Sequence, residues 1–337
     1  MLTVTIFIIL VALSFDFLNG MNDAANSIAT VVSTRVLTPK LAVAWAAFFN
    51  FVAAFGFGVA VATTIGKGIV DPAVVSQDMT LGALVGAIVW THLCTKYGLP
   101  ISVSHSLIGG MGGAAIAKAG FDALILSGIW KVVLFIFLSP MIGMVLGFVL
   151  MVAVTWAFRR FSVRKVDRFF RVGQLISSAA YSLGHGTNDA QKTMGIIAVL
   201  LFTTDAAVPT WMYDKSIGFH VPMWVILAAH AAIGLGTLVG GWRVIHTLGM
   251  KLTHLRPVGG FCAETGGAMV LLGTALAGIP VSTTHTIAGT IMGVGSTRRL
   301  SAVRWGIAGR IITAWILTIP TSALVAALSY YFVALLF

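Results

Sequence analysis

Long apolar stretches, separated by short polar ones, run along almost the whole chain. The main apolar runs are residues 3–18, 41–65, 79–95, 124–158, 221–242, 258–277 and 303–337. They do not alternate polar and apolar positions, as the strands of a membrane barrel would. A helix needs about 20 apolar residues to cross a bilayer, and most of these runs are long enough. Because backbone polar groups in hydrocarbon must be satisfied internally, we predict an all-α polytopic membrane protein.

The polar interruptions of this pattern occur twice. Gly20–Asn26 (GMNDAAN) returns 166 positions later as Gly186–Lys192 (GTNDAQK), and Gly98–Ser106 (GLPISVSHS) returns 180 positions later as Gly278–Thr286 (GIPVSTTHT). Gly, Pro, Asn and Asp all disfavour continuous helix. Two halves interrupted at matching places are typical of secondary transporters built from repeats. We predict an N-terminal transmembrane repeat at 1–158, a basic cytoplasmic linker at 159–171 and a C-terminal transmembrane repeat at 172–337.

Charge fixes an orientation for these repeats. Charged residues make up 9% of the chain, where a soluble domain has about 25%. The formal net charge of +11 is attributed to cytoplasmic loops and not to nucleic-acid binding, because Lys and Arg gather in short loops. Placing the basic segments 35–40, 159–171, 243–256 and 298–304 inside puts both termini outside the cytoplasm. It makes 79–118 and 258–297 re-entrant hairpins, and gives the two repeats inverted topology in a multi-pass protein of the cell (inner) membrane.

Four of the acidic residues lie inside apolar stretches: Asp16, Asp23, Asp189 and Glu264. An ionised carboxylate at mid-bilayer costs roughly 2.5–3.5 kcal/mol, so such residues mark ion or substrate paths. Asp23 and Asp189 are equivalent in the repeats and are expected to approach one site from opposite leaflets. At each we expect an unwound segment with free carbonyls and a new helix N-terminus. A plain turn or helix cap is the alternative for a single copy, and the second copy argues against it. Asp16 has no acidic counterpart.

Hydroxyl groups follow Gly-x-Pro in both halves: Ser102, Ser104 and Ser106, then Ser282, Thr283, Thr284 and Thr286. Proline ends a helix, and Ser or Thr caps the next one. Capping explains one hydroxyl in each half, so the others predict an oxyanion receptor at a positive helix end. No Lys or Arg stands beside the motifs in both halves, since Lys96 and Lys192 each occur on one side only. An anion next to two aspartates then requires bound cations, which favours symport.

These motifs, together with His185–Gly195, resemble the signatures of the inorganic phosphate transporter (PiT) family, bacterial type, in order and over nearly the whole chain. The resemblance implies a homodimeric secondary active transporter that imports phosphate, or metal-phosphate, by symport with Na⁺ or H⁺ through alternating access around a midplane site. The residues and the resemblance together give phosphate ligands at Ser102, Ser104, Ser282, Thr283, Thr284, Asn22 and Asn188. The coupling ion is assigned to Asp23, Asp189, Asn26, Glu264 and Asn50, with the two aspartates as metal ligands if the ion is Na⁺. At Asn50 relatives often carry an acid.

Other readings stay open at this point. His105 and His285 are equivalent and start half-helices, where a structural or capping role competes with metal binding. His185, four residues before Asp189, is either a proton-linked partner or a hydrogen-bonded core histidine. A channel, a carrier of another oxyanion such as sulfate, and an intramembrane hydrolase are the alternative functions. A hydrolase needs one asymmetric site, so the doubling of every motif favours a protein that is not an enzyme and has no cofactor besides its coupling ion.

Overall fold

The computed structural model describes residues 2–204 and 207–335, and in this part of the chain every regular element is a helix. The first half contains α1 (Leu2–Ser33), α2 (Pro39–Val52), α3 (Ala60–Gly68), α4 (Gln77–Tyr97), α5 (Val103–Ala119) and α6 (Leu126–Ala157). The second contains α7 (Val163–Thr203), α8 (Met223–Val239), α9 (Trp242–His246), α10 (Pro257–Leu276), α11 (Thr283–Ser296) and α12 (Trp305–Ala334). The predicted all-α fold is confirmed.

Single helical turns complete the inventory: η1 (Ala53–Phe55), η2 (Pro72–Val74), η3 (Phe121–Ala123), η4 (Lys215–Ile217), the π-turn η5 (Thr247–Lys251) and η6 (Leu300–Ala302). Among the described residues, α1, α4, α6, α10 and α12 are long and apolar enough to cross a membrane. Two bent pairs pass the same test, α2–α3 with a bend of 81° and α8–α9 with a bend of 66°. Most of the basic linker forms the first turns of α7, and the outer limits of the predicted repeats, residues 1 and 337, fall outside the described residues.

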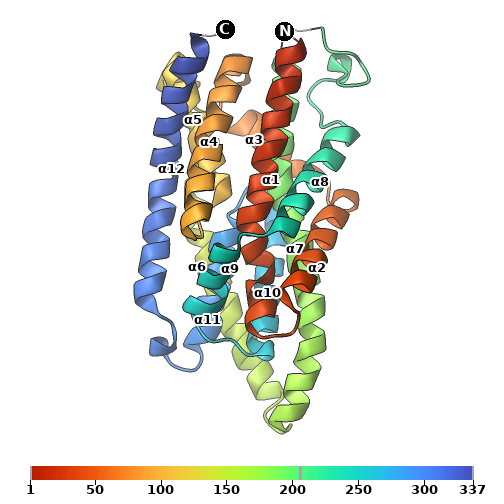
Figure 1. The fold of residues 1–337 in the computed structure, drawn as a ribbon, viewed down its shortest axis with the longest axis vertical. Helices are drawn as coiled ribbons and strands as arrows, with labels where there is room; N and C mark the ends of the chain where they lie inside the picture. Colours follow the sequence, from red (N-terminus) through yellow and green to blue (C-terminus); the bar gives the residue numbers. More distant parts are fainter. Residues whose placement is uncertain (1, 205–206, 336–337) are drawn as a thin grey trace.

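The two halves present the same kinds of element in the same order. Each has a long helix with the aspartate motif, a bent pair, a hairpin whose second helix is capped by serine, and a long helix with an interior proline, Pro140 or Pro320. The capped helix of each half packs on the last helix of the other, α5 against α12 and α11 against α6. The start of α1 and the end of α12 lie at one end of the molecule, and the α6–α7 connection lies at the other (Figure 1).

The expectation that the helices unwind at the aspartate motifs is wrong. Both α1 and α7 continue through them. The glycines of the motifs allow close packing of helices instead. A Cβ on Gly20 would lie 2.1 Å from the backbone carbonyl oxygen of Ile233 in α8, and a Cβ on Gly186 would lie 2.6 Å from the backbone carbonyl oxygen of Asn50 in α2. The asparagine and aspartate side chains of the motifs bond to residues outside their own helix, and only Thr187 donates to a carbonyl of its own helix, that of Leu183.

The chain breaks elsewhere, and one predicted break is confirmed. In each hairpin the first helix is followed by a glycine in the left-handed region, Gly98 (φ 69°) or Gly278 (φ 67°), where a Cβ would be strained. Pro follows, and the hydroxyl of Ser102 or Ser282 then accepts a hydrogen bond from the N–H three residues later, at 3.2 Å in both halves. The bent pairs break at further glycines, of which Gly240 has φ 71°.

The segments predicted outside the cytoplasm meet at one end of the bundle. The Asp71 N–H donates to the Ala123 carbonyl at 2.9 Å, which joins the loop after α3 to the turn after α5. The side-chain amide of Gln77, at the start of α4, donates to Thr5 and to Thr204. The start of α1 and the end of α7 therefore lie at this same end.

The basic segments are joined in the same way. The Arg171 guanidinium donates to the Arg35 carbonyl at 2.5 Å, so the loop after α1 lies beside the start of α7. The Arg304 N–H donates to the Leu252 carbonyl at 3.0 Å, which joins the segments around 252 and 304. These bonds join the predicted cytoplasmic segments in pairs, and the inverted topology of the two halves stays a prediction.

Candidate functional site

The aspartate helices α1 and α7 meet the starts of α5 and α11 inside the bundle. Asp23 is 1% exposed and Asp189 is 0% exposed. Since α5 and α11 begin at their serine caps, each directs its free N-terminal N–H groups and its positive dipole end into the interior. The site therefore combines buried acids with two helix N-termini.

One hydroxyl bridges the two carboxylates. Thr283 Oγ1 lies 3.2 Å from Asp23 Oδ2 and 3.0 Å from Asp189 Oδ2, and Thr284 Oγ1 lies 3.4 Å from Asp23 Oδ1. The amide of Asn26 donates to both threonines, at 3.2 and 2.9 Å. The structure thus brings together five of the predicted site residues, drawn from both repeats.

Lys192 completes the cluster. Its ammonium donates to Asp189, to the Ser104 hydroxyl and, at 2.8 Å, to the Val281 carbonyl, and the side chain is 2% exposed. The motifs alone assign Lys192 no role in the site. The signal that could have found it is its spacing: on a continuous helix, residues three apart share a face, so Lys192 must lie beside Asp189.

His185 faces the same acids from the other side. Its Nε2 lies 3.2 Å from Asp189 Oδ2 and 3.9 Å from Asp23 Oδ2. Its Nδ1 lies 3.1 Å from the side-chain oxygen of Asn50, while the side-chain amide nitrogen of Asn50 donates to the Thr237 hydroxyl at 3.0 Å. The Thr237 hydroxyl donates its own proton to a backbone carbonyl of α8 at 2.8 Å, so it can only accept from Asn50. The amide nitrogen of Asn50 therefore faces Thr237, its side-chain oxygen faces His185, and His185 Nδ1 carries the hydrogen of that contact.

A cation or a proton is needed on the remaining side of that imidazole. With Nδ1 protonated, Nε2 can approach a carboxylate only if a proton or a cation lies between them. Ligand atoms of Asp23, His185 and Asp189 lie within 4.8 Å of one another, close enough to share one ion. With His185 neutral, two carboxylates against one ammonium leave one negative charge in the cluster, which a proton or a cation can neutralise. The arrangement is therefore a buried receptor for a cation.

The other predicted ligands are held slightly apart from the bridged carboxylates. Asn22 donates to Thr95 of α4 at 2.7 Å, and the Asn188 oxygen accepts from the Val281 N–H at 3.4 Å. Ser102 and Ser282 act as caps. The oxygen of Asn22 and the amide nitrogen of Asn188 are buried without a partner in the described part of the chain, so both keep polar capacity for a ligand.

Glu264 belongs to a separate polar cluster. Its carboxylate accepts from Thr30 and Ser177 at 2.5 Å each and from Gln174 at 3.0 Å. In the described structure, none of these three residues forms a hydrogen bond with Asp23 or Asp189. The structure therefore does not join Glu264 to the other residues assigned to the coupling ion, and a role for it there stays a prediction.

With this geometry in place, similarity to known proteins decides the family. Residues 19–326 match the phosphate transporter family. The chain belongs to this family. It is 55% identical to a protein of Rhizobium meliloti (strain 1021) named probable low-affinity inorganic phosphate transporter, over 96% of this chain and 95% of that protein. A protein of the same name from Bacillus subtilis (strain 168) is 44% identical, over 100% and 99%. A solved structure titled the sodium-dependent phosphate transporter aligns with a TM-score of 0.86 at 27% identity, over 99% and 100%.

Family membership confirms the resemblance that the motifs carry, and it shows a transport function in place of an enzymatic one.

The histidines at equivalent positions of the two hairpins pack against each other. The rings of His105 and His285 meet edge-on with centroids 4.7 Å apart, and His285 stacks on Trp315 at 3.7 Å. These contacts give both rings a packing role next to the site.

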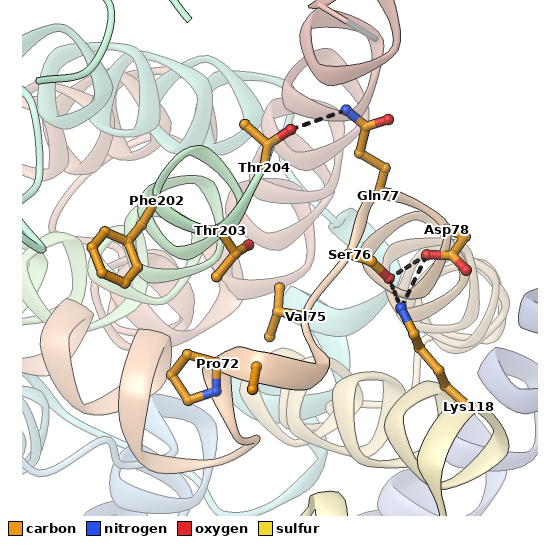
Figure 2. Close-up of a pocket in the computed structure, with 10 residues that line it drawn as sticks. Pro72, Val75, Ser76, Gln77, Asp78, Lys118, Phe202, Thr203 and Thr204 are labelled. Carbon is orange, nitrogen blue, oxygen red and sulfur yellow. Dashed lines mark hydrogen bonds and ion pairs between the residues drawn. The ribbon is translucent and has the colours of Figure 1, made fainter. Parts of the chain in front are cut away.

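A pocket of about 690 Å³ opens at the end of the bundle that holds the start of α1. It is lined by Ser76, Asp78, Lys118 and the end of α7, where Thr203 and Thr204 lie (Figure 2). Lys118 reaches Ser76 and lies 3.5 Å from the Asp78 carboxylate. None of the residues lining the pocket belongs to the aspartate cluster, so the pocket is separate from the candidate site.

Proposed function

We propose that this protein imports inorganic phosphate across the cell membrane by symport with a cation, at the cluster of Asp23, Asp189, Thr283, Thr284 and Lys192. The observation that carries the proposal is the shared hydroxyl: carboxylates from two equivalent motifs converge on Thr283, at the N-terminus of α11. The names of the relatives indicate phosphate as the substrate. The name of the structural neighbour favours Na⁺ as the coupling ion.

Within the cluster the two charges have different partners. Carboxylate and amide oxygens of Asp23, Asp189 and Asn26 are hard ligands that suit a small cation. Backbone N–H groups, hydroxyls and helix dipoles at the starts of α5 and α11 suit an oxyanion. The Lys192 ammonium, between Asp189 and Ser104, faces both kinds of ligand.

Electrostatics make the two ligands depend on each other. With His185 neutral, the cluster carries one net negative charge before a cation binds. Two like charges 4 Å apart repel by about 4 kcal/mol at an effective dielectric constant of 20, which is roughly three powers of ten in affinity. A bound cation removes this repulsion, so phosphate binds well only in company with it. That is the thermodynamic basis of symport.

We further propose that the two halves provide alternating access. We propose that they are inverted repeats, that the basic end faces the cytoplasm and that both termini lie outside. Rocking of one half against the other would then open the fixed site to each side in turn. A homodimer, which the family resemblance implies, is part of the same proposal.

Reconstitution tests the function. Purified protein in liposomes should accumulate ³²P-phosphate when an inward Na⁺ gradient or an inward proton gradient is imposed, each with the other held at zero. The driving gradient identifies the coupling ion. Excess unlabelled phosphate should compete and sulfate should not, with protein-free liposomes as the control. Uptake that is indifferent to both gradients would contradict symport, and equal competition by sulfate would make the protein a general oxyanion carrier.

A further inference from the structure

The two equivalent motifs differ at one position that reaches the site. Asn26 in α1 is matched by Lys192 in α7, because both follow the Asp of their motif by three residues. Each directs its nitrogen to the capped helix of a hairpin: Asn26 to Thr284 of α11, and Lys192 to Ser104 of α5. Ser104 and Thr284 are themselves equivalent. The same place in the two repeats thus holds a neutral amide on one side and an ammonium on the other.

The oxygen atoms around Lys192 form a cation site. Its ammonium contacts the Asp189 carboxylate, the Ser104 hydroxyl and the Val281 carbonyl, all of them oxygens. Oxygen donors of these three kinds are also the ligands of hard metal cations. A permanent positive charge, attached to the chain, already occupies this half of the site.

The half around Asp23 holds comparable oxygens and no ammonium group, and the His185 imidazole approaches Asp23 only to 3.9 Å. Thr283 and Thr284 supply two hydroxyls to Asp23, whereas Val103, the counterpart of Thr283, offers Asp189 none. Among the described residues, the carbonyl oxygen of Asn26 is buried without a partner. An unsatisfied buried oxygen beside a carboxylate and two hydroxyls indicates room for one more positive ligand.

We propose that Lys192 is a tethered cation that permanently fills the second of two equivalent cation positions, so that one exchangeable monovalent cation binds, at Asp23. This inference rests on the proposed symport, whose stoichiometry it sets. A tethered ammonium neutralises Asp189 in every step of the cycle and cannot be carried across. A chain with an amide at both equivalent positions would transport one more cation with each phosphate than this protein does.

Restoring the symmetry tests the inference. In Lys192→Asn the amide of the first repeat is copied into the second, the tether is removed and the oxygen cage is left vacant. Na⁺ should then enter it. We expect purified Lys192→Asn to show a rise in melting temperature with Na⁺, against choline, that exceeds the wild-type rise by about 3 °C or more at saturation. Uptake of ³²P-phosphate should become more steeply dependent on Na⁺.

Lys192→Arg keeps the positive charge, so a folded Lys192→Arg protein should not gain the additional rise in melting temperature with Na⁺. Lys192→Gln is the second neutral variant. No additional Na⁺ response in a folded neutral variant overturns the proposal. Failure of both neutral variants to fold in Na⁺, while Lys192→Arg folds, overturns it as well, since a free cation could not replace the tether. The melting readout is independent of transport, so absence of wild-type uptake would refute the proposed function without deciding this inference.

Discussion

Thr283→Val removes the hydroxyl that bridges the two aspartates and keeps the size and β-branching of the side chain. In the structure this hydroxyl lies 3.2 Å from Asp23 and 3.0 Å from Asp189. It has one proton, so it donates to one carboxylate at a time. Asn26 keeps its bond to Thr284 when the hydroxyl is lost. The change therefore removes about one hydrogen bond to a charged group and little else.

The magnitude follows from that count. A hydrogen bond to a charged group contributes about 1.5–3 kcal/mol, and 1.4 kcal/mol is tenfold in an equilibrium constant. Half-saturation by the coupling ion should therefore rise by about tenfold to a hundredfold.

The assay is the initial rate of ³²P-phosphate uptake into proteoliposomes as the coupling ion is varied. Thr283→Ser keeps the hydroxyl and should stay within a few-fold of wild type. Thr313→Val makes the same exchange on the exposed side of α12, where the hydroxyl bonds only its own helix at the Gly309 carbonyl, and should change nothing. Half-saturation of Thr283→Val within twofold of wild type would show that the bridge does not belong to the ion site.

Two further predictions test the packing and the topology. Gly20→Ala should lower stability by about 1–3 kcal/mol, seen as a lower melting temperature, because its Cβ meets a backbone oxygen at 2.1 Å; Gly309→Ala, with open space around it, is the control, and equal melting temperatures would refute the close contact. In a chain without its native cysteines, single cysteines in the basic segments should react with impermeant maleimide from the cytoplasmic face, and cysteines in the opposite loops only from outside. The positions are Arg164 and Arg299, against Asp71 and Lys215. Labelling of 71 and 164 from the same face would exclude inverted repeats.

Local signals made the hairpins predictable. Gly98, Pro100 and Ser102 end one helix and cap the next through contacts within a few residues, so the sequence alone carries the information. The continuity of α1 through Asn22 and Asn26 was not predictable in this way. The amide nitrogens of both side chains donate to residues far along the chain, Thr95 and Thr283, and these partners remove the competition that normally breaks a helix.

The expectation of an unwound segment also left the role of Lys192 in the site unpredicted. In an unwound segment its side chain could point anywhere, whereas a continuous helix places it three residues from Asp189 and on the same face. Candidate residues could therefore be found from motifs and their repetition. Their pairing could not, because it depends on whether a polar segment stays helical, and that is decided by tertiary contacts.

The central claim is that Asp23 and Asp189 together hold the ion that couples phosphate transport. Uptake of ³²P-phosphate by proteoliposomes containing Asp23→Asn or Asp189→Asn, at matched protein content and under the gradient that drives the wild type, tests it most directly. Each variant keeps the shape of the side chain and loses the charge. Both variants should lose gradient-driven uptake while remaining folded in the membrane. Wild-type accumulation by either variant would contradict it.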